Sequence, residues 1–381
     1  MRVRVFLPAL ACAVVVLSIA LSEQPVYSHK PITTPIIYKK EIAQIFQRKC
    51  FNCHSENNLA MPLTTYELAR PWARAIREEV LARQMPPWGA VTGFGHFQND
   101  VSLTQRELDI ILSWADGGAP SGVLKVEESI PPVFVPAAPM WEAGEPDEVI
   151  AVTKPVTVAA GAGNSVQTVE LRTPLSSPRV VKGLAFKPGD RRVVRYAAIY
   201  EAGSGRWLWT WTPWHTSMNL PDGVGYKLPV RAALRVEVGY RGIDEAVTDK
   251  SEVGLYFGDT PVRRDATTMV IAPAAVPIKA GATAAKVRAE MTLTSATRGL
   301  AIWPELGDGA RSVEVAAVAP DGVVEPLLWV KDVQADWPTP YVFRAPISFA
   351  RGTRLVMTAY YANPTDTPRS ARPRISVVTA P

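Results

Sequence analysis

Residues 50–54 read Cys50-Phe51-Asn52-Cys53-His54, a C-x-x-C-H pentapeptide, and they decide which fold we expect for the first part of the chain. Two thiols at this spacing can form thioethers with the two vinyl groups of one porphyrin, and the adjacent imidazole can then bind the iron. The pattern therefore predicts one covalently attached haem c. Cys50 and Cys53 would be its attachment points and His54 its proximal ligand.

Two other interpretations of the pentapeptide have less support. A closed structural zinc site needs four nitrogen or sulfur ligands, and the only remaining cysteine, Cys12, lies in the N-terminal apolar run described next. A thioredoxin-like redox pair would stand at a strand-to-helix turn, whereas Cys50 follows a run of helical character at residues 41–49.

The start of the chain has the pattern of an export signal. A short basic segment at residues 1–4 precedes an almost wholly apolar run at 5–21, and small residues allow cleavage after Ser22. We therefore expect a signal peptide at 1–22, a tether at 23–35 and a periplasmic protein. If the signal stays uncleaved, the protein is tethered to the membrane, since the apolar run is just long enough to span a bilayer.

Composition limits the classes of function. The chain has 381 residues, of which 47% are hydrophobic, so its length predicts two or three domains. Its net charge of +5 is small and dispersed, and no basic run with interleaved aromatic residues is present, which argues against nucleic-acid binding. The 11 tryptophans and 34 prolines favour short strands joined by turns.

Helical signals concentrate between residues 36 and 122, where we expect an all-α domain. The first predicted helix, at 41–49, leads directly into the pentapeptide, and a second spans 66–83 with apolar residues at four-residue steps. A third begins at a capping box formed by Thr104 and Glu107, and ends at a pair of glycines. Three helices around one prosthetic group fit a small haem domain.

A c-type haem needs a second axial ligand, and Met85 is the best candidate. It lies in the segment Gln84-Met85-Pro86-Pro87-Trp88, whose prolines restrict the backbone and can present the thioether to iron. Met61 is an alternative, although it follows His54 closely in the chain. His96 is another, although Gly93 and Gly95 make its segment loose.

The character of the sequence changes after residue 122. Residues 123–145 are rich in proline, acidic residues and alanine, and predict a linker. From residue 146 onward, short runs rich in valine, tyrosine and leucine alternate with turn signals. We expect two β-sandwich domains in tandem, at 146–271 and 272–381.

Several segments resemble one family of bacterial exported proteins, in which a cytochrome c module is fused to a copper type II, ascorbate-dependent monooxygenase-like region. The segments are 50–54, 65–77 (TYELARPWARAIR), 84–88, 99–103 and 114–120 (WADGGAP), and later 220–225 (LPDGVG), 253–257 (VGLYF) and 320–322 (PDG). The resemblance implies a multidomain fold: an all-α cytochrome c domain of class I type, then an all-β region of two jelly-roll or β-sandwich halves.

The chain departs from that family where copper would bind. The family places its two coppers on five histidines and a methionine, which suit cycling copper. This chain has four histidines, His29, His54, His96 and His215. The resemblance, read with this departure, predicts that copper is absent and that copper-dependent hydroxylation is lost.

Taken together, these observations predict an exported monohaem cytochrome that transfers electrons to or from a periplasmic redox partner. The β region would act as its scaffold or docking surface, and we expect no catalytic residues. Two alternatives stay open at this point: a haem-fed, monooxygenase-like redox enzyme, and a haem-based ligand-binding or sensor protein.

Overall fold

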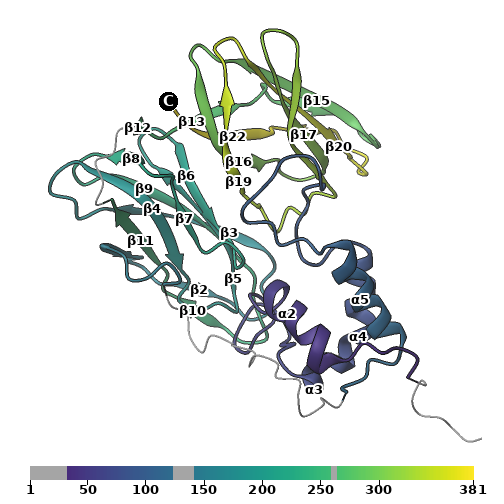
Figure 1. Ribbon diagram of the computed structural model, residues 1–381. Helices are drawn as coiled ribbons and strands as arrows, with labels where there is room; N and C mark the ends of the chain where they lie inside the picture. The colour runs from purple at the N-terminus through teal and green to yellow at the C-terminus, as the bar shows by residue number, and fades with distance from the viewer. Residues whose placement is uncertain (1–31, 123–140, 259–263) are drawn as a thin grey trace, which may run out of the picture.

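The computed structural model describes residues 32–122, 141–258 and 264–381. They form a helical layer and two β units, which Figure 1 shows arranged around a common junction. The predicted signal peptide, most of the predicted tether with His29, and residues 123–140 of the predicted linker lie outside the described residues. No helix within the described ranges is both long and apolar enough to cross a bilayer.

The helical layer is built from short helices that pack around a small apolar core. Its elements are η1 (Tyr38–Ile42), α2 (Ala43–Lys49), α3 (Tyr66–Ala69), η2 (Arg70–Trp72), α4 (Ala73–Leu81) and α5 (Gln105–Asp116). Ile42 and Phe46 share one helical face because they are four residues apart, and Ile111 and Trp114 share another. All four side chains are fully buried. The rings of Phe46 and Trp114 meet edge to face, which joins α2 to α5.

Helix α5 begins where its sequence predicts. The Thr104 hydroxyl accepts a hydrogen bond from the Glu107 amide at 3.2 Å, and the Thr104 amide donates to the Glu107 carboxylate at 2.9 Å. This capping box satisfies two amides that the first turn leaves without partners. The predicted capping box is confirmed, and it fixes the point at which the chain re-enters the helical layer.

The first β unit contains two main sheets and a short ribbon. One sheet has the order β1-β11-β4-β8-β12, with β7 also pairing with β4; the other has the order β3-β9-β5-β6; and β2 pairs with β10. The strands are β1 (Glu148–Ala151), β2 (Val156–Val158), β3 (Ser165–Arg172), β4 (Arg179–Lys187), β5 (Val194–Glu201), β6 (Arg206–Trp211), β7 (Ser217–Asn219), β8 (Val224–Leu228), β9 (Ala233–Tyr240), β10 (Val247–Asp249), β11 (Glu252–Phe257) and β12 (Arg264–Asp265).

The second β unit repeats this plan with two four-stranded sheets. Their orders are β13-β22-β16-β19 and β15-β20-β17-β18, and β14 pairs with β21. The strands are β13 (Thr267–Ile271), β14 (Val276–Ile278), β15 (Ala285–Thr292), β16 (Thr297–Glu305), β17 (Ala310–Val318), β18 (Val324–Lys331), β19 (Tyr341–Phe349), β20 (Arg354–Tyr361), β21 (Arg369–Ala371) and β22 (Arg374–Ala380).

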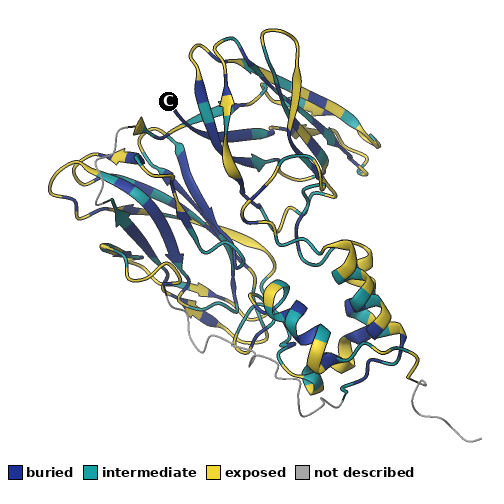
Figure 2. Ribbon diagram, in the orientation of Figure 1, coloured by how far each residue is buried: buried dark blue, intermediate teal, exposed yellow. Residues whose placement is uncertain are grey.

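The two β units share part of their hydrophobic core. Trp207 of β6 stacks on Trp303 of β16 at 5.1 Å between ring centroids, and the Thr268 hydroxyl donates to the Trp207 carbonyl at 2.6 Å. Leu300 and Val378 of the second unit also pack within the core of the first. Figure 2 shows the resulting band of buried residues along the strands of both units. The β units are therefore not independent sandwiches.

A segment between α4 and α5, residues 88–99, leaves the helical layer and lies along the second β unit; we call it the strap. Figure 1 shows it as the dark blue loop that rises to the second unit. Its backbone pairs with β18 and β19, through Val91 N to Trp329 O at 2.8 Å and Gln98 N to Val342 O at 2.9 Å. Two large strap side chains, Trp88 and Phe97, are buried in the core of the second β unit, beside Tyr341.

The predicted fold class is therefore wrong. The described residues form twenty-two strands, whereas their four α-helices have only 4 to 12 residues each. Residues 36–122 do not close into an all-α domain, because their strap supplies aromatic side chains to a β core. The second unit also begins with β13, a little before the boundary expected at residue 272. Local helical periodicity identified the helices but could not show where the strap packs.

Candidate functional site

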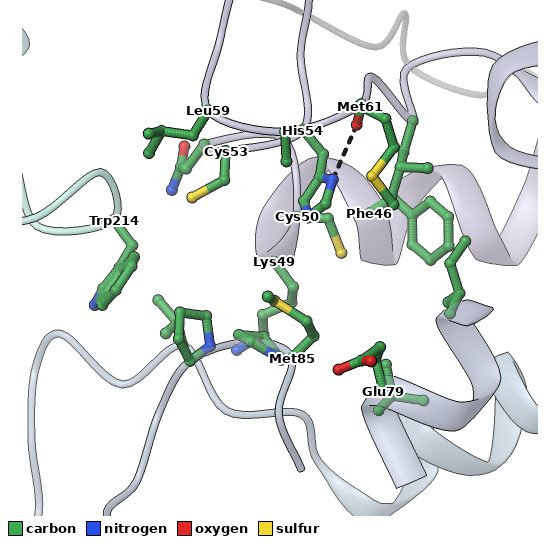
Figure 3. A pocket seen from close by; sticks show the side chains of 18 of the residues that line it. Phe46, Lys49, Cys50, Cys53, His54, Leu59, Met61, Glu79, Met85 and Trp214 are labelled. Carbon is green, nitrogen blue, oxygen red and sulfur yellow. Dashed lines mark hydrogen bonds between the residues drawn. The ribbon is translucent and has the colours of Figure 1, made fainter. Parts of the chain in front are cut away.

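A cavity of about 320 Å³ lies where the helical layer meets both β units. This volume is at the lower end of the range for small-molecule sites, roughly 300–1,000 Å³. The helical layer supplies Cys50, Cys53 and His54 of the pentapeptide together with Met61 and Met85, and Figure 3 shows these side chains around the central space. The β units supply Arg195, Trp214, Arg241, Asp336 and Trp337. Most of the remaining lining is apolar.

The pentapeptide forms a tight turn at the end of α2. The amides of Cys53 and His54 both donate to the Cys50 carbonyl, at 3.1 and 2.9 Å. Phe51 is buried in the core of the helical layer, and its side chain anchors the turn to that core. The turn therefore places Cys50, Cys53 and His54 together on one wall of the cavity (Figure 3).

The His54 ring is fixed by a backbone contact. Its Nδ1 lies 2.9 Å from the Met61 carbonyl oxygen, drawn as a dashed line in Figure 3. A carbonyl only accepts hydrogen bonds, so Nδ1 carries the proton and Nε2 keeps a free lone pair. Burial lowers the pKa of His54 against the opposing effect of that carbonyl, which favours the neutral ring. A neutral imidazole with a free Nε2 is suited to bind a metal ion.

The two thiols form no disulfide. Burial raises the pKa of Cys50 to about 12, and the same cause raises the pKa of Cys53 to about 12 although nearby Arg195 acts in the opposite direction. Both side chains are therefore protonated at neutral pH. A thioredoxin-like pair works through a thiolate of low pKa, so this environment argues against that alternative.

The structure separates the candidates for the opposite side of the cavity. Figure 3 shows Met85 across the space from His54, whereas Met61 lies on the His54 side. The amide of Met85 donates to the Glu79 carbonyl at 3.3 Å, which holds the segment against the end of α4. His96 is exposed on the strap and does not line the cavity. Of these three side chains, Met85 is the one placed to face His54.

Trp72 and Trp88, the two tryptophans nearest Met85 in the sequence, do not line the cavity. Trp72 is exposed, and Trp88 is buried against the second β unit. The tryptophans that do line the cavity are Trp214 and Trp337, whose ring centroids are 5.4 Å apart. No local pattern identifies these two, because one follows β6 and the other lies between β18 and β19.

A second cavity, of about 470 Å³, lies between the two β units. Its lining includes Tyr196, Glu237, Trp303 and Glu305. The Tyr200 hydroxyl donates to the Glu305 carboxylate at 3.0 Å. Burial raises the pKa of Glu305, partly offset by Arg374. The carboxylate is thus already hydrogen-bonded and ion-paired within the fold.

The histidine of the β region, His215, packs against an aromatic side chain. No group of three or more histidine, cysteine or acidic side chains that could hold a metal ion occurs among the described residues. The His215 ring packs edge to face on Trp209, and burial lowers its pKa to about 4. His215 is therefore a neutral, packed side chain at neutral pH.

Comparisons with known proteins place the chain in no family. No family model matches it, and no curated protein matches its sequence. Among solved structures, it is similar to the major capsid protein P2 of bacteriophage PM2, at 11% identity and a TM-score of 0.26, over 61% of this chain and 96% of that one. It is also similar to the VP2 subviral particle of infectious bursal disease virus, at 9% identity and a TM-score of 0.22, over 61% and 70%. The exported protein XepA of PBSX matches at 11% identity and a TM-score of 0.18, over 67% and 100%.

Likenesses this distant assign no function to the chain. The family predicted from its sequence is corrected by the structure, because residues 36–122 do not close into an all-α domain and their strap packs into the core of the second β unit. The predicted fusion of a cytochrome c domain to a monooxygenase-like region is therefore wrong. The electron-transfer role depended on that family and is withdrawn, as are the two alternatives of a redox enzyme and a sensor.

The site residues and the cofactor do not depend on the family, because they were inferred from the pentapeptide and from the segment at residues 84–88. No comparison tests them. Export to the periplasm and a redox partner also stay predictions, since the signal lies outside the described residues.

Proposed function

We propose that the three-way cavity binds one haem, held by thioethers to Cys50 and Cys53 and bound at iron by His54 and Met85. The observation that carries this proposal is the fixed His54 ring, whose free Nε2 stands beside two unoxidised thiols on one wall of an apolar cavity. An iron porphyrin is a planar apolar group with a metal that binds imidazole and thioether.

The donor set fits this group and fits zinc less well. A structural zinc ion takes four ligands at tetrahedral geometry, and in the described chain no three histidine, cysteine or acidic side chains are arranged so that they could hold a metal ion by themselves. The thioether of Met85, on the opposite side of the space, is a soft ligand that haem iron accepts. An imidazole and a thioether on opposite sides of one cavity could together hold such a group.

Attachment would be a balanced addition. Each S–H adds across one vinyl C=C bond: sulfur bonds one carbon, the thiol hydrogen goes to its neighbour, and the double bond becomes single. No oxidant or reductant is consumed and nothing leaves. When bound, the haem supplies a redox-active iron. The chain's own residues hold the ring, fix the His54 tautomer and exclude water with the apolar lining.

A bound ring would stabilise the helical layer. Its helices are short, and the cavity lies directly against its small core, where Phe46, Ile76 and Val80 contribute to both. Isolated helices of this length are marginal in water, so their stability depends on tertiary packing. A bound ring would extend the core of the helical layer across the cavity.

The test is to express the full chain with bacterial haem-maturation factors and to measure its mass and absorption spectrum under denaturing and native conditions. We expect the mass of one added haem, retained after denaturation. The double variant Cys50→Ala/Cys53→Ala should lose the covalent haem. A wild-type protein that emerges colourless at its bare apoprotein mass would refute the proposal.

A further inference from the structure

The wall of the cavity opposite the helical layer carries two arginines. Arg195 lies in β5 and Arg241 directly follows β9, the strand paired with β5. The pairing has a bulge at Arg195, because Val194 pairs with Tyr240 and Tyr196 with Gly239. A bulge redirects the side chain of the extra residue. The Arg241 amide donates to the Val193 carbonyl at 2.9 Å, so the two arginines are held on adjacent backbones.

These two guanidinium groups lack the carboxylate partners that nearby arginines have. Arg191 and Arg192 form ion pairs with Glu142, Asp190 and Glu245. No ion pair within 4.0 Å joins Arg195 or Arg241 to a carboxylate in the described part of the chain. Arg195 stacks its guanidinium over the Trp337 ring at 4.7 Å, while its Nε is buried without a hydrogen-bond partner.

Such an arrangement costs free energy in the absence of a ligand. A buried N–H without an acceptor loses its hydration, and two like charges on adjacent strands repel each other. Asp336 is the one acidic residue that the β units contribute to this cavity, so the β wall keeps an excess of positive charge. A ligand with carboxylates at its edge would remove both penalties, since guanidinium binds carboxylate through paired hydrogen bonds.

We propose that Arg195 and Arg241 bind the two propionate carboxylates of the haem, so that the first β unit completes the site. This inference rests on the proposed function, because haem is the ligand that brings two carboxylates into this cavity. One ring would then be bound covalently by the helical layer and through its propionates by the β wall. Haem loading would tie the two parts of the molecule together.

The experiment compares thermal unfolding of the full chain with and without haem, for wild type, Arg195→Gln, Arg241→Gln and the double variant. Haem-free protein is obtained by expression without maturation factors, and mass spectrometry confirms the loading of each sample. In wild type, haem should raise the Tm. Each single substitution should reduce that haem-dependent rise by about 2–4 °C, with the haem mass retained.

Arg172→Gln is the matched control, because Arg172 is an exposed arginine in β3 of the same unit. It should leave the haem-dependent rise unchanged. Arg195→Lys keeps the charge but not the paired hydrogen bonds, and should recover part of the rise lost in Arg195→Gln. A role in folding alone would lower the Tm of the loaded and haem-free forms equally.

The outcomes separate the inference from the proposed function. Haem mass in every variant, with a haem-dependent rise that the arginine substitutions do not change, would overturn the propionate assignment alone. Equal loss of Tm in both forms would overturn it as well. Absence of covalent haem from wild type would overturn both proposals.

Discussion

The Nδ1 atom of His54 lies 2.9 Å from the backbone carbonyl oxygen of Met61, seven residues further along the chain. Because the acceptor belongs to the backbone, this contact fixes the ring without using the Met61 side chain. It leaves Nε2 of the neutral ring with a lone pair that could bind a metal ion. Met61 and Met85 therefore have different roles, which substitution can separate.

Met85→Leu should remove the second iron ligand, while Met61→Leu should not. Leucine keeps the apolar volume at either position, so packing changes little. In the haem-loaded ferric protein, the weak far-red band of a methionine–iron bond should be present in wild type and in Met61→Leu, and absent in Met85→Leu. The absorption spectrum of the three proteins checks this. Loss of the band in Met61→Leu alone would reverse the assignment.

His54→Ala should leave the haem attached and change its spectrum. The thioethers depend on Cys50 and Cys53, whereas the electronic state of the iron depends on its axial ligands. We expect an unchanged protein mass with a shifted main absorption band. A spectrum identical to wild type would show that His54 does not bind the iron.

Removal of Trp88 should destabilise the second β unit, although Trp88 belongs to the helical part of the sequence. Its side chain is 7% exposed and contacts Tyr341 at 4.9 Å between ring centroids. Trp88→Ala should lower the free energy of unfolding by about 3–5 kcal/mol, as expected for a large buried aromatic residue. Trp72→Ala is the control, since Trp72 is 43% exposed, and should change it by less than about 1 kcal/mol. Chemical denaturation measures both, and equal effects would argue against strap packing.

The stacked pair Trp207 and Trp303 should couple the two β units energetically. Their ring centroids are 5.1 Å apart, and both side chains are buried. A double-mutant cycle with Trp207→Leu and Trp303→Leu should give a coupling energy of about 0.5–1.5 kcal/mol. Additive effects within experimental error would mean that the units are stabilised separately.

Glu305 should make stability fall as the pH rises above about 4.5, which is the ordinary pKa of this carboxyl group. Burial raises its pKa in the folded state, so the folded protein holds this proton more tightly than the unfolded chain does. The stabilisation that Glu305 gives the folded protein is complete at pH values below the pKa that this carboxyl has in the unfolded chain. It is lost as the pH rises through the higher pKa that the carboxyl has in the folded protein. Chemical denaturation at several pH values between 4 and 7 gives the free energy of unfolding as a function of pH. The slope of that dependence should be more negative in wild type than in Glu305→Gln. The exposed Glu314→Gln on β17 is the control and should keep the wild-type slope.

Local features of the chain were predictable from the sequence where the interaction partners lie close together along it. The capping box joins Thr104 to Glu107, and the pentapeptide turn joins Cys50 to His54. Both involve only neighbouring backbone groups, so a short pattern determines them. The strap was not predictable, because the partner of Phe97 is Phe343, far along the chain.

By itself, the sequence determined the chemistry of one wall of the site: two thiols and an imidazole at a spacing that suits one haem. Only the tertiary structure decided that this wall faces a β unit, that Met85 stands opposite His54, and that Arg195 and Arg241 close the cavity. The physical reason is that side-chain type and helical period are properties of adjacent residues. The packing of distant segments instead depends on which apolar surfaces bury one another when the whole chain folds.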